Sequence, residues 1–121
     1  MAKIERATSS NWKEVLKSEV PVAVEFYTPT CPFCRQLTPI LEKLSGEYAG
    51  RMKFAIVDAS SESDLAMGYG IMGVPTIKFF CAGRPIAEVV GLTSEEELRA
   101  IFEDVLKKYK KCVSESSPLY A

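Results

Sequence analysis

Apolar residues recur along the chain at two spacings, one typical of helices and one typical of buried strands. Two stripes have the helical spacing, and they contain Leu37, Ile40, Leu41, Leu44 and Tyr48, and Leu98, Ile101, Phe102, Val105, Leu106 and Tyr109. The run 22–27 is apolar on both faces except for one carboxylate, which is typical of a central strand covered by helices. Shorter patterns predict strands over 3–7, 52–57, 76–81 and 86–90, and helices beginning near Trp12 and Ser61.

Together the predicted elements follow the order β-α-β-α-β-α-β-β-α. This order predicts an α/β fold, a single domain in which a central mixed sheet is flanked by helices on both faces. Asn11 with Glu14, and Ser94 with Glu97, have the spacing of a helix-capping box. Pro39 lies inside the helix predicted by the stripe from Leu37 to Tyr48 and should kink it.

The end of the chain has a different composition. After residue 110 the apolar periodicity stops, and Ser and Pro become frequent. Chain ends of this kind are commonly poorly ordered. We therefore expect the domain to span residues 1–110 and residues 111–121 to form a mobile tail.

Composition excludes several classes of function. The chain has 121 residues and a formal net charge of −1, so it lacks the excess of Lys and Arg that a strongly basic nucleic-acid binder needs. It contains no histidine. Every Ser–His or Cys–His nucleophile pair and every zinc site with a His ligand is thereby excluded. Chemistry must depend on Cys, carboxylates, Lys or Tyr.

Four cysteines are too few for a secreted disulfide framework. The first residues carry charge where a signal peptide would need an apolar core. The longest weakly charged stretch, 65–83, contains a lysine, a proline and four glycines, which makes it a poor transmembrane segment. We expect a cytoplasmic protein with no membrane partner.

Cys31-Pro32-Phe33-Cys34 is the most informative motif. Two cysteines at positions i and i+3 on the first turn of a helix lie close enough to form a small disulfide ring. The free N–H groups and positive dipole end of that turn stabilise a thiolate at Cys31, whereas Cys34 lies further into the helix and suits a resolving thiol. The alternative is half of a zinc site, but no second C-x-x-C and no histidine can complete it.

A second motif has a dinucleotide-binding spacing. Residues 68–73 read Gly-Tyr-Gly-Ile-Met-Gly and match G-x-G-x-x-G. That fingerprint must follow a strand and open a helix, but here it follows a predicted helix and runs into Val74–Pro75. We interpret these residues as loop glycines.

Four segments, taken in order, resemble the thioredoxin family. They are Val-Glu-Phe-Tyr, Thr-Cys-Pro-Phe-Cys-Arg, Gly-Val-Pro-Thr, and Val-Gly-Leu before the last helix. The resemblance covers residues 3 to about 110 and implies a thioredoxin fold. It also implies that Val74–Pro75 is a cis peptide bond facing the Cys31 sulfur, and that the substrate chain docks on the backbone there.

The resemblance assigns roles to further residues. Glu25 stands where thioredoxins usually have a buried aspartate that helps to deprotonate the resolving cysteine. A carboxylate in an apolar strand should have a raised pKa, which suits a proton carrier. The lysine that the family often places beside that acid is replaced by Ile56. The apolar docking surface around the cysteines is expected to contain Thr30, Pro32, Phe33, Val74 and Gly91.

The loop between the cysteines departs from the usual thioredoxin sequence Trp-Cys-Gly-Pro-Cys. Proline directly after the first cysteine resembles glutaredoxins and periplasmic disulfide oxidases. A glutaredoxin is disfavoured by the extra N-terminal strand and helix, and by residues 92–95, which offer little to bind a glutathione carboxylate. An oxidase would need an inserted helical domain and an export signal. A more oxidising glutaredoxin-like, oxidase or isomerase activity is the alternative within the enzyme class.

The other two cysteines, Cys81 and Cys112, fit plain buried or tail thiols better than a functional role. The topology of the family would place both at the pole away from the active site. A bond between them is therefore an open alternative, disfavoured in a reducing compartment.

These features predict a thiol–disulfide oxidoreductase that reduces protein disulfides through Cys31 and Cys34, with Glu25 and Pro75 completing the catalytic site. No cofactor is required, because a thioredoxin-reductase-like donor would supply electrons through thiol exchange. We expect a monomer. From another class, the alternative is a thioredoxin-fold binding module that has merely kept its cysteines.

Overall fold

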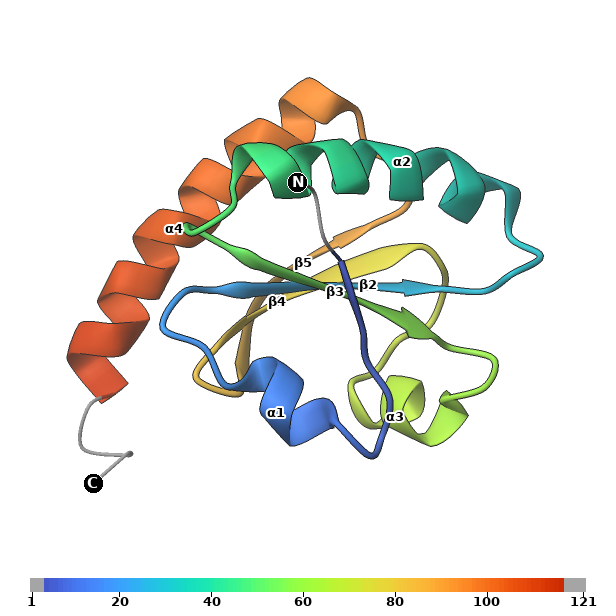
Figure 1. Cartoon of the computed structure of the whole chain (residues 1–121), viewed down its shortest axis with the longest axis horizontal. Coiled ribbons are helices and arrows are strands. Elements are labelled where there is room, and N and C mark those ends of the chain that lie inside the picture. Colours follow the sequence, from blue (N-terminus) through green and yellow to red (C-terminus); the bar gives the residue numbers. More distant parts are fainter. Residues whose placement is uncertain (1–3, 117–121) are drawn as a thin grey trace.

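The computed structural model describes residues 4–116 and contains nine elements in the predicted order (Figure 1). They are β1 (Glu5–Arg6), α1 (Trp12–Leu16), β2 (Val22–Tyr27), α2 (Pro32–Glu47), β3 (Lys53–Asp58), α3 (Ser63–Gly68), β4 (Thr76–Cys81), β5 (Arg84–Val90) and α4 (Glu95–Ser116).

The strands form one mixed sheet in the order β1-β3-β2-β4-β5. β3 runs parallel to both β1 and β2, whereas β4 is antiparallel to β2 and β5. Helices α2 and α4 cover one face of the sheet and α1 and α3 cover the other (Figure 1). The predicted single-domain α/β fold with helices on both faces is confirmed.

Strand β2 lies at the centre, and its first five residues are buried. Its side chains alternate between two apolar clusters because successive residues of a strand point to opposite faces. Ala23 packs with α2 and α4, whereas Val24 and Phe26 pack with Trp12 and its neighbours on α1. The Glu25 side chain points toward α2, so one carboxylate lies beneath the helix whose N-terminus carries the cysteine pair.

One of the two predicted capping boxes is wrong. The Asn11 side chain accepts from the Thr8 N–H at 2.7 Å and donates to the Arg6 carbonyl at 3.0 Å, so it fixes the preceding loop and makes no cap on α1. At α4 the Ser94 hydroxyl accepts from the Glu97 N–H at 3.2 Å, and the Glu97 carboxylate accepts from that hydroxyl at 3.0 Å.

Helix α4 is longer than the sequence predicts. It continues to Ser116, so residues 111–116 are helical, where we expected the start of a mobile tail. Tyr109 and Val113 both line a groove between α1 and α4, which shows that the apolar stripe continues one turn further. The remaining residues of the expected tail, 117–121, lie outside the described part of the chain.

The interpretation of Cys81 and Cys112 as separate thiols is also wrong. They form a disulfide that joins the buried end of β4 to the part of α4 beyond residue 110, with Cα atoms 6.6 Å apart. A two-residue turn, Ala82–Gly83, follows Cys81 with both residues at positive φ. This turn brings β5 back beside β4 and leaves Cys81 facing α4.

Candidate active site

The first cysteine caps the N-terminus of α2. Cys31 precedes Pro32, the first helical residue, whose missing N–H costs little at that position. The Cys34 backbone N–H donates to the Cys31 Sγ at 3.1 Å. A thiolate at Cys31 is therefore favoured by a direct N–H donor and by the positive end of a sixteen-residue helix.

The second cysteine has a different environment. Cys34 is 2% exposed, whereas Cys31 is partly accessible. Burial, with smaller contributions from the nearby Cys31 and Glu25, raises the pKa of the Cys34 thiol to about 12. Because Cys34 cannot ionise by itself near neutrality, any attack by this sulfur needs a proton acceptor.

The loop before β4 faces the cysteines. The predicted cis bond at Val74–Pro75 is confirmed, and the Cys31 Sγ lies 3.8 Å from the Val74 carbonyl oxygen. The Gly91 N–H donates to the Pro75 carbonyl at 2.8 Å. Gly91 has φ +94°, a conformation that residues with a side chain rarely adopt. The end of β5 is thereby held beside Pro75.

The carboxylate of β2 is buried below this loop. Glu25 is 0% exposed, and its register neighbours on β3 and β4 are Ile56 and Ile77. Its hydrogen bonds come from the Thr38 hydroxyl on α2, 3.0 Å from each carboxylate oxygen. Burial raises the pKa of Glu25 from 4.5 to about 7, Thr38 opposes this shift, and Glu42 adds to it. The predicted raised pKa is confirmed.

This pKa makes stability depend on pH. Glu25 is protonated in the fold up to about pH 7 but ionises near 4.5 in the unfolded chain, so stability falls as pH rises between these values and is level above them. Replacing Glu25 with Gln removes the cost of burying the anion. The unfolding free energy of Glu25→Gln relative to wild type should therefore rise by about 3 kcal/mol between about pH 4.5 and about pH 8.

Urea unfolding of both proteins across that range measures the change. Groups that titrate identically in the two proteins cancel in the difference. A difference that stays constant with pH would show that Glu25 titrates alike in the folded and unfolded states.

All the residues that the sequence predicts for the site meet at one end of the sheet. Thr30, Pro32 and Phe33 surround Cys31 on the surface, and the Phe33 side chain is 57% exposed. Sequence reasoning missed Thr38, whose only signal was its position four residues after Cys34 on the same helix. It also missed Met72, which is 97% exposed two residues before Val74.

The G-x-G-x-x-G segment begins at the last residue of α3 and continues as a loop toward Pro75. It follows a helix and opens onto β4, and Gly70 has φ +69° within a turn. The interpretation as loop glycines is confirmed for Gly70 and Gly73, whereas Gly68 is the last helical residue of α3.

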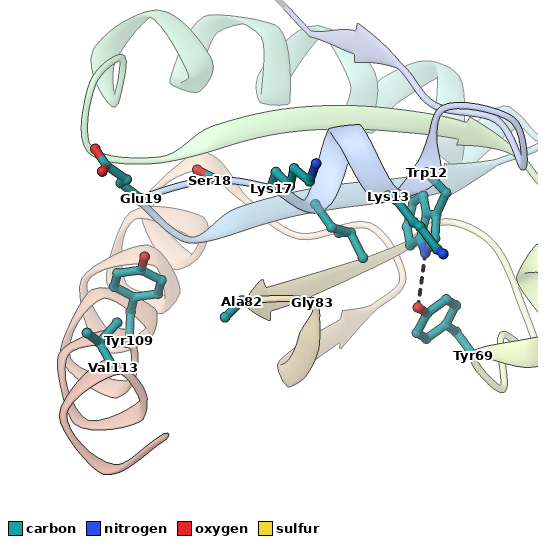
Figure 2. Close-up of a pocket in the computed structure, with 11 residues that line it drawn as sticks. Trp12, Lys13, Lys17, Ser18, Glu19, Tyr69, Ala82, Gly83, Tyr109 and Val113 are labelled. Atoms are coloured by element: carbon teal, nitrogen blue, oxygen red, sulfur yellow. Dashed lines mark hydrogen bonds between the residues drawn. The ribbon is translucent and has the colours of Figure 1, made fainter. Parts of the chain in front are cut away.

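A second hollow lies on another part of the molecule. A groove with a volume of about 1130 Å³ is bounded by α1, the β4–β5 turn and the end of α4 (Figure 2). At one end of it the Trp12 indole N–H donates to the Tyr69 hydroxyl at 3.0 Å. Its walls are mostly apolar, with Lys13, Lys17 and Glu19 at the rim. None of the residues predicted for the redox site lines it. Among residues 4–116, no helix is long and apolar enough to cross a membrane.

Comparisons with known proteins agree with this geometry. A family model for thioredoxin matches residues 3–104. Thioredoxin C-2 of Corynebacterium nephridii is 37% identical over 103 residues, which cover 84% of this chain and 95% of that protein. Thioredoxin 1 of Nostoc sp. is 34% identical over 85% of this chain and 97% of that protein. The solved structure of Malassezia sympodialis thioredoxin matches with a TM-score of 0.78 at 28% identity, covering 86% of this chain and 91% of that one.

Proposed function

Because this chain belongs to the thioredoxin family, whose members are protein-disulfide oxidoreductases, we propose that Cys31 is its attacking thiol and Cys34 its resolving thiol. The protein is a thiol–disulfide oxidoreductase that acts on protein disulfides. The asymmetry between the two cysteines carries the assignment of roles. Cys31 is partly accessible at a helix N-terminus, whereas Cys34 is buried and its pKa is raised to about 12.

In the first step the Cys31 thiolate attacks one sulfur of a substrate disulfide. A bond forms between Cys31 Sγ and that sulfur, the substrate S–S bond breaks, and the other substrate sulfur leaves as a thiolate. The Cys34 N–H on Cys31 Sγ and the N-terminus of α2 support this thiolate before the attack. The product of the step is a mixed disulfide.

In the second step Cys34 transfers its proton to Glu25 and attacks the Cys31 sulfur. The Cys31–Cys34 bond forms, the mixed disulfide breaks, and the second substrate sulfur leaves as a thiolate. The substrate gains two electrons, and the protein loses two. Glu25 suits the proton transfer because its pKa of about 7 lets it accept a proton near neutrality and release it afterwards.

The substrate docks on the apolar surface around Cys31. Thr30, Pro32 and Phe33 form one side of this surface, and Val74 and Gly91 form the other. An extended substrate segment can pair with the backbone beside Pro75, which supports recognition of a chain with little regard to its sequence. Met72 and Leu92 add exposed apolar side chains next to Val74 and Gly91.

The oxidised pair is returned to the dithiol by an electron donor of the thioredoxin-reductase class, so no resident cofactor is required. The protein acts as a monomer in the cytoplasm. The dithiol chemistry of Cys31 and Cys34 supports this compartment, because a reductase must keep the two reduced between turnovers, whereas the Cys81–Cys112 bond is more typical of an oxidising compartment.

The reduction potential of the Cys31–Cys34 pair tests whether the protein acts as a reductant. We expect the pair to be a net donor to protein disulfides when it is equilibrated with a dithiothreitol buffer. Exchanging Pro32-Phe33 for Gly-Pro moves the free N–H from residue 33 to residue 32. An N-cap side chain accepts from the second and third helical N–H groups, so the exchange takes one donor away from the Cys31 thiolate. The pair should become more reducing by some tens of millivolts, at about 30 mV per 1.4 kcal/mol.

Phe33→Leu is the matched control, because it changes the side chain and keeps the N–H. A wild-type potential as oxidising as that of a disulfide oxidase would overturn the direction that we propose. A loop exchange without effect, or with the opposite sign, would move control of the potential to Thr30, Ile56 or the Val74–Pro75 segment.

A further inference from the structure

The Thr38 hydroxyl contacts three oxygen atoms. Its Oγ1 lies 3.0 Å from both carboxylate oxygens of Glu25 and 2.9 Å from the backbone carbonyl oxygen of Cys34. A hydroxyl carries one hydrogen and accepts through two lone pairs. It therefore cannot donate fully to the carboxylate and to the carbonyl at once.

The number of hydrogens in this cluster depends on Glu25. When Glu25 is ionised, only the Thr38 hydrogen is shared among the three contacts, and it is drawn to the anion. When Glu25 is protonated, its own O–H can donate to Thr38 Oγ1, and the Thr38 hydrogen is free to turn to the Cys34 carbonyl. Both arrangements fit the same oxygen positions, so the switch needs only a rotation of the hydroxyl.

We infer that Thr38 is a positioning residue that holds Glu25 in both of its protonation states and links its proton to the backbone of the resolving cysteine. This inference rests on the proposed role of Glu25 as the acceptor of the Cys34 proton. The balance of the step is unchanged: the proton leaves Cys34 Sγ and arrives at the Glu25 carboxylate. The Thr38 hydroxyl accepts a hydrogen bond from that new O–H and itself donates to the Cys34 backbone carbonyl.

In the described part of the chain, the other side chains around Glu25 provide no positive charge to stabilise its carboxylate. The neighbours on β3 and β4 are Ile56 and Ile77, which carry no charge. The titratable neighbours on α2 are Cys34 and Glu42, and neither side chain can carry a positive charge that would stabilise the Glu25 anion. On β2 itself, Tyr27 lies two positions further on the same face. Within residues 4–116, no Lys or Arg pairs with Glu25.

Removing the Thr38 hydroxyl should therefore raise the pKa of Glu25. The hydrogen bond from Thr38 lowers the pKa of Glu25 against the effect of burial. Thr38→Val keeps the shape of the side chain and removes the donor, so the pKa of Glu25 should rise by about one unit. At about pH 7 the ionised fraction of Glu25 then falls about fivefold, whereas at about pH 9 it is nearly complete in both proteins.

The test follows the reduced protein as it reacts with a symmetrical aromatic disulfide whose released thiolate absorbs visible light. The first burst of thiolate reports attack by Cys31, and the second reports resolution by Cys34. In Thr38→Val the second phase should slow about fivefold near pH 7 and approach the wild-type rate near pH 9. The first phase should be unaffected. Thr38→Ser restores the hydroxyl and should restore the wild-type pH profile.

A second readout does not depend on turnover. The chemical shift of the Glu25 carboxyl carbon, followed by NMR against pH, should show an inflection about one unit higher in Thr38→Val and unchanged in Thr38→Ser. Thr38→Ala provides the same comparison if the valine variant does not fold. In Glu25→Gln, the further change Thr38→Val should have no effect on the pH profile.

Each outcome separates the inference from the proposed function. If Glu25→Gln removes the pH dependence but Thr38→Val leaves the inflection in place, Glu25 acts without Thr38 and the inference is overturned. Equal shifts in Thr38→Ser and Thr38→Val would assign the effect to packing and would also overturn it. If Glu25→Gln leaves the second phase unchanged, the proposed role of Glu25 fails and the inference fails with it.

Discussion

Replacing Cys34 with serine should convert the protein from a catalyst into a trap that stays covalently joined to its substrate. The Cys31 thiolate can still attack a protein disulfide, because its N–H donor comes from the backbone of residue 34 and survives the change. The mixed disulfide then has no neighbouring thiol to break it. We expect turnover with insulin to fall by more than about a hundredfold, with a covalent adduct on a non-reducing gel.

The matched control is Cys31→Ser. It leaves Cys34 as the free thiol of the pair, 2% exposed and with its pKa raised to about 12, so it should form no adduct. Both variants retain the Cys81–Cys112 pair, so any exchange through that second pair contributes equally to the two and cancels in their comparison. Equal trapping by the two variants would reverse or abolish the division of roles between Cys31 and Cys34.

Features with a local cause could be predicted from the sequence. The buried run at 22–27 predicts a central strand because a half-exposed strand would alternate, and β2 has those bounds. The cysteine pair could be assigned to redox chemistry because the chain lacks the ligands that a zinc site requires. The raised pKa of Glu25 follows from one carboxylate in an otherwise apolar strand.

Features that depend on distant partners could not be predicted in the same way. Thr38 is an ordinary residue within a helix until the packing of α2 on β2 brings its hydroxyl to Glu25. The Asn11 cap failed because loop atoms at Arg6 and Thr8 compete for the same side chain. In each case a local pattern allows several partners, and the tertiary structure selects one.

The pair Cys81–Cys112 shows the same limit and leads to the second large effect. The two cysteines have a sequence separation of 31, so their bond closes a long loop that includes β5 and most of α4. Closing a loop of this length removes conformational freedom from the unfolded chain, with an expected stabilisation of about 3–4 kcal/mol. Cys112→Ala should cost this amount in non-reducing buffer, because it removes the bond and leaves Cys81 as a small buried thiol.

The same substitution in excess dithiothreitol is the internal control. Both proteins then lack the bond, and the Cys31–Cys34 pair is reduced in both, so Cys112→Ala should cost less than about 1 kcal/mol. Denaturant unfolding in the two buffers gives four free energies, and their double difference isolates the bond. A small cost in both buffers would show that the disulfide does not form in solution. A large cost in both would assign the stability to packing of the Cys112 side chain.

The end of α4 should respond to the same chemistry. Beyond residue 110 the helix is held to the sheet by the Cys81–Cys112 bond, and Val113 is 43% exposed. Helical residues with few buried contacts open readily, so we expect the amides of 111–116 to be protected from hydrogen exchange in the oxidised protein and to exchange faster in the reduced one. In the reduced protein, residues 111–116 would then behave as the mobile segment that the sequence predicts, whereas in the oxidised protein they form the end of α4. Equal protection of these amides in both redox states would show that α4 holds its last turns without the bond.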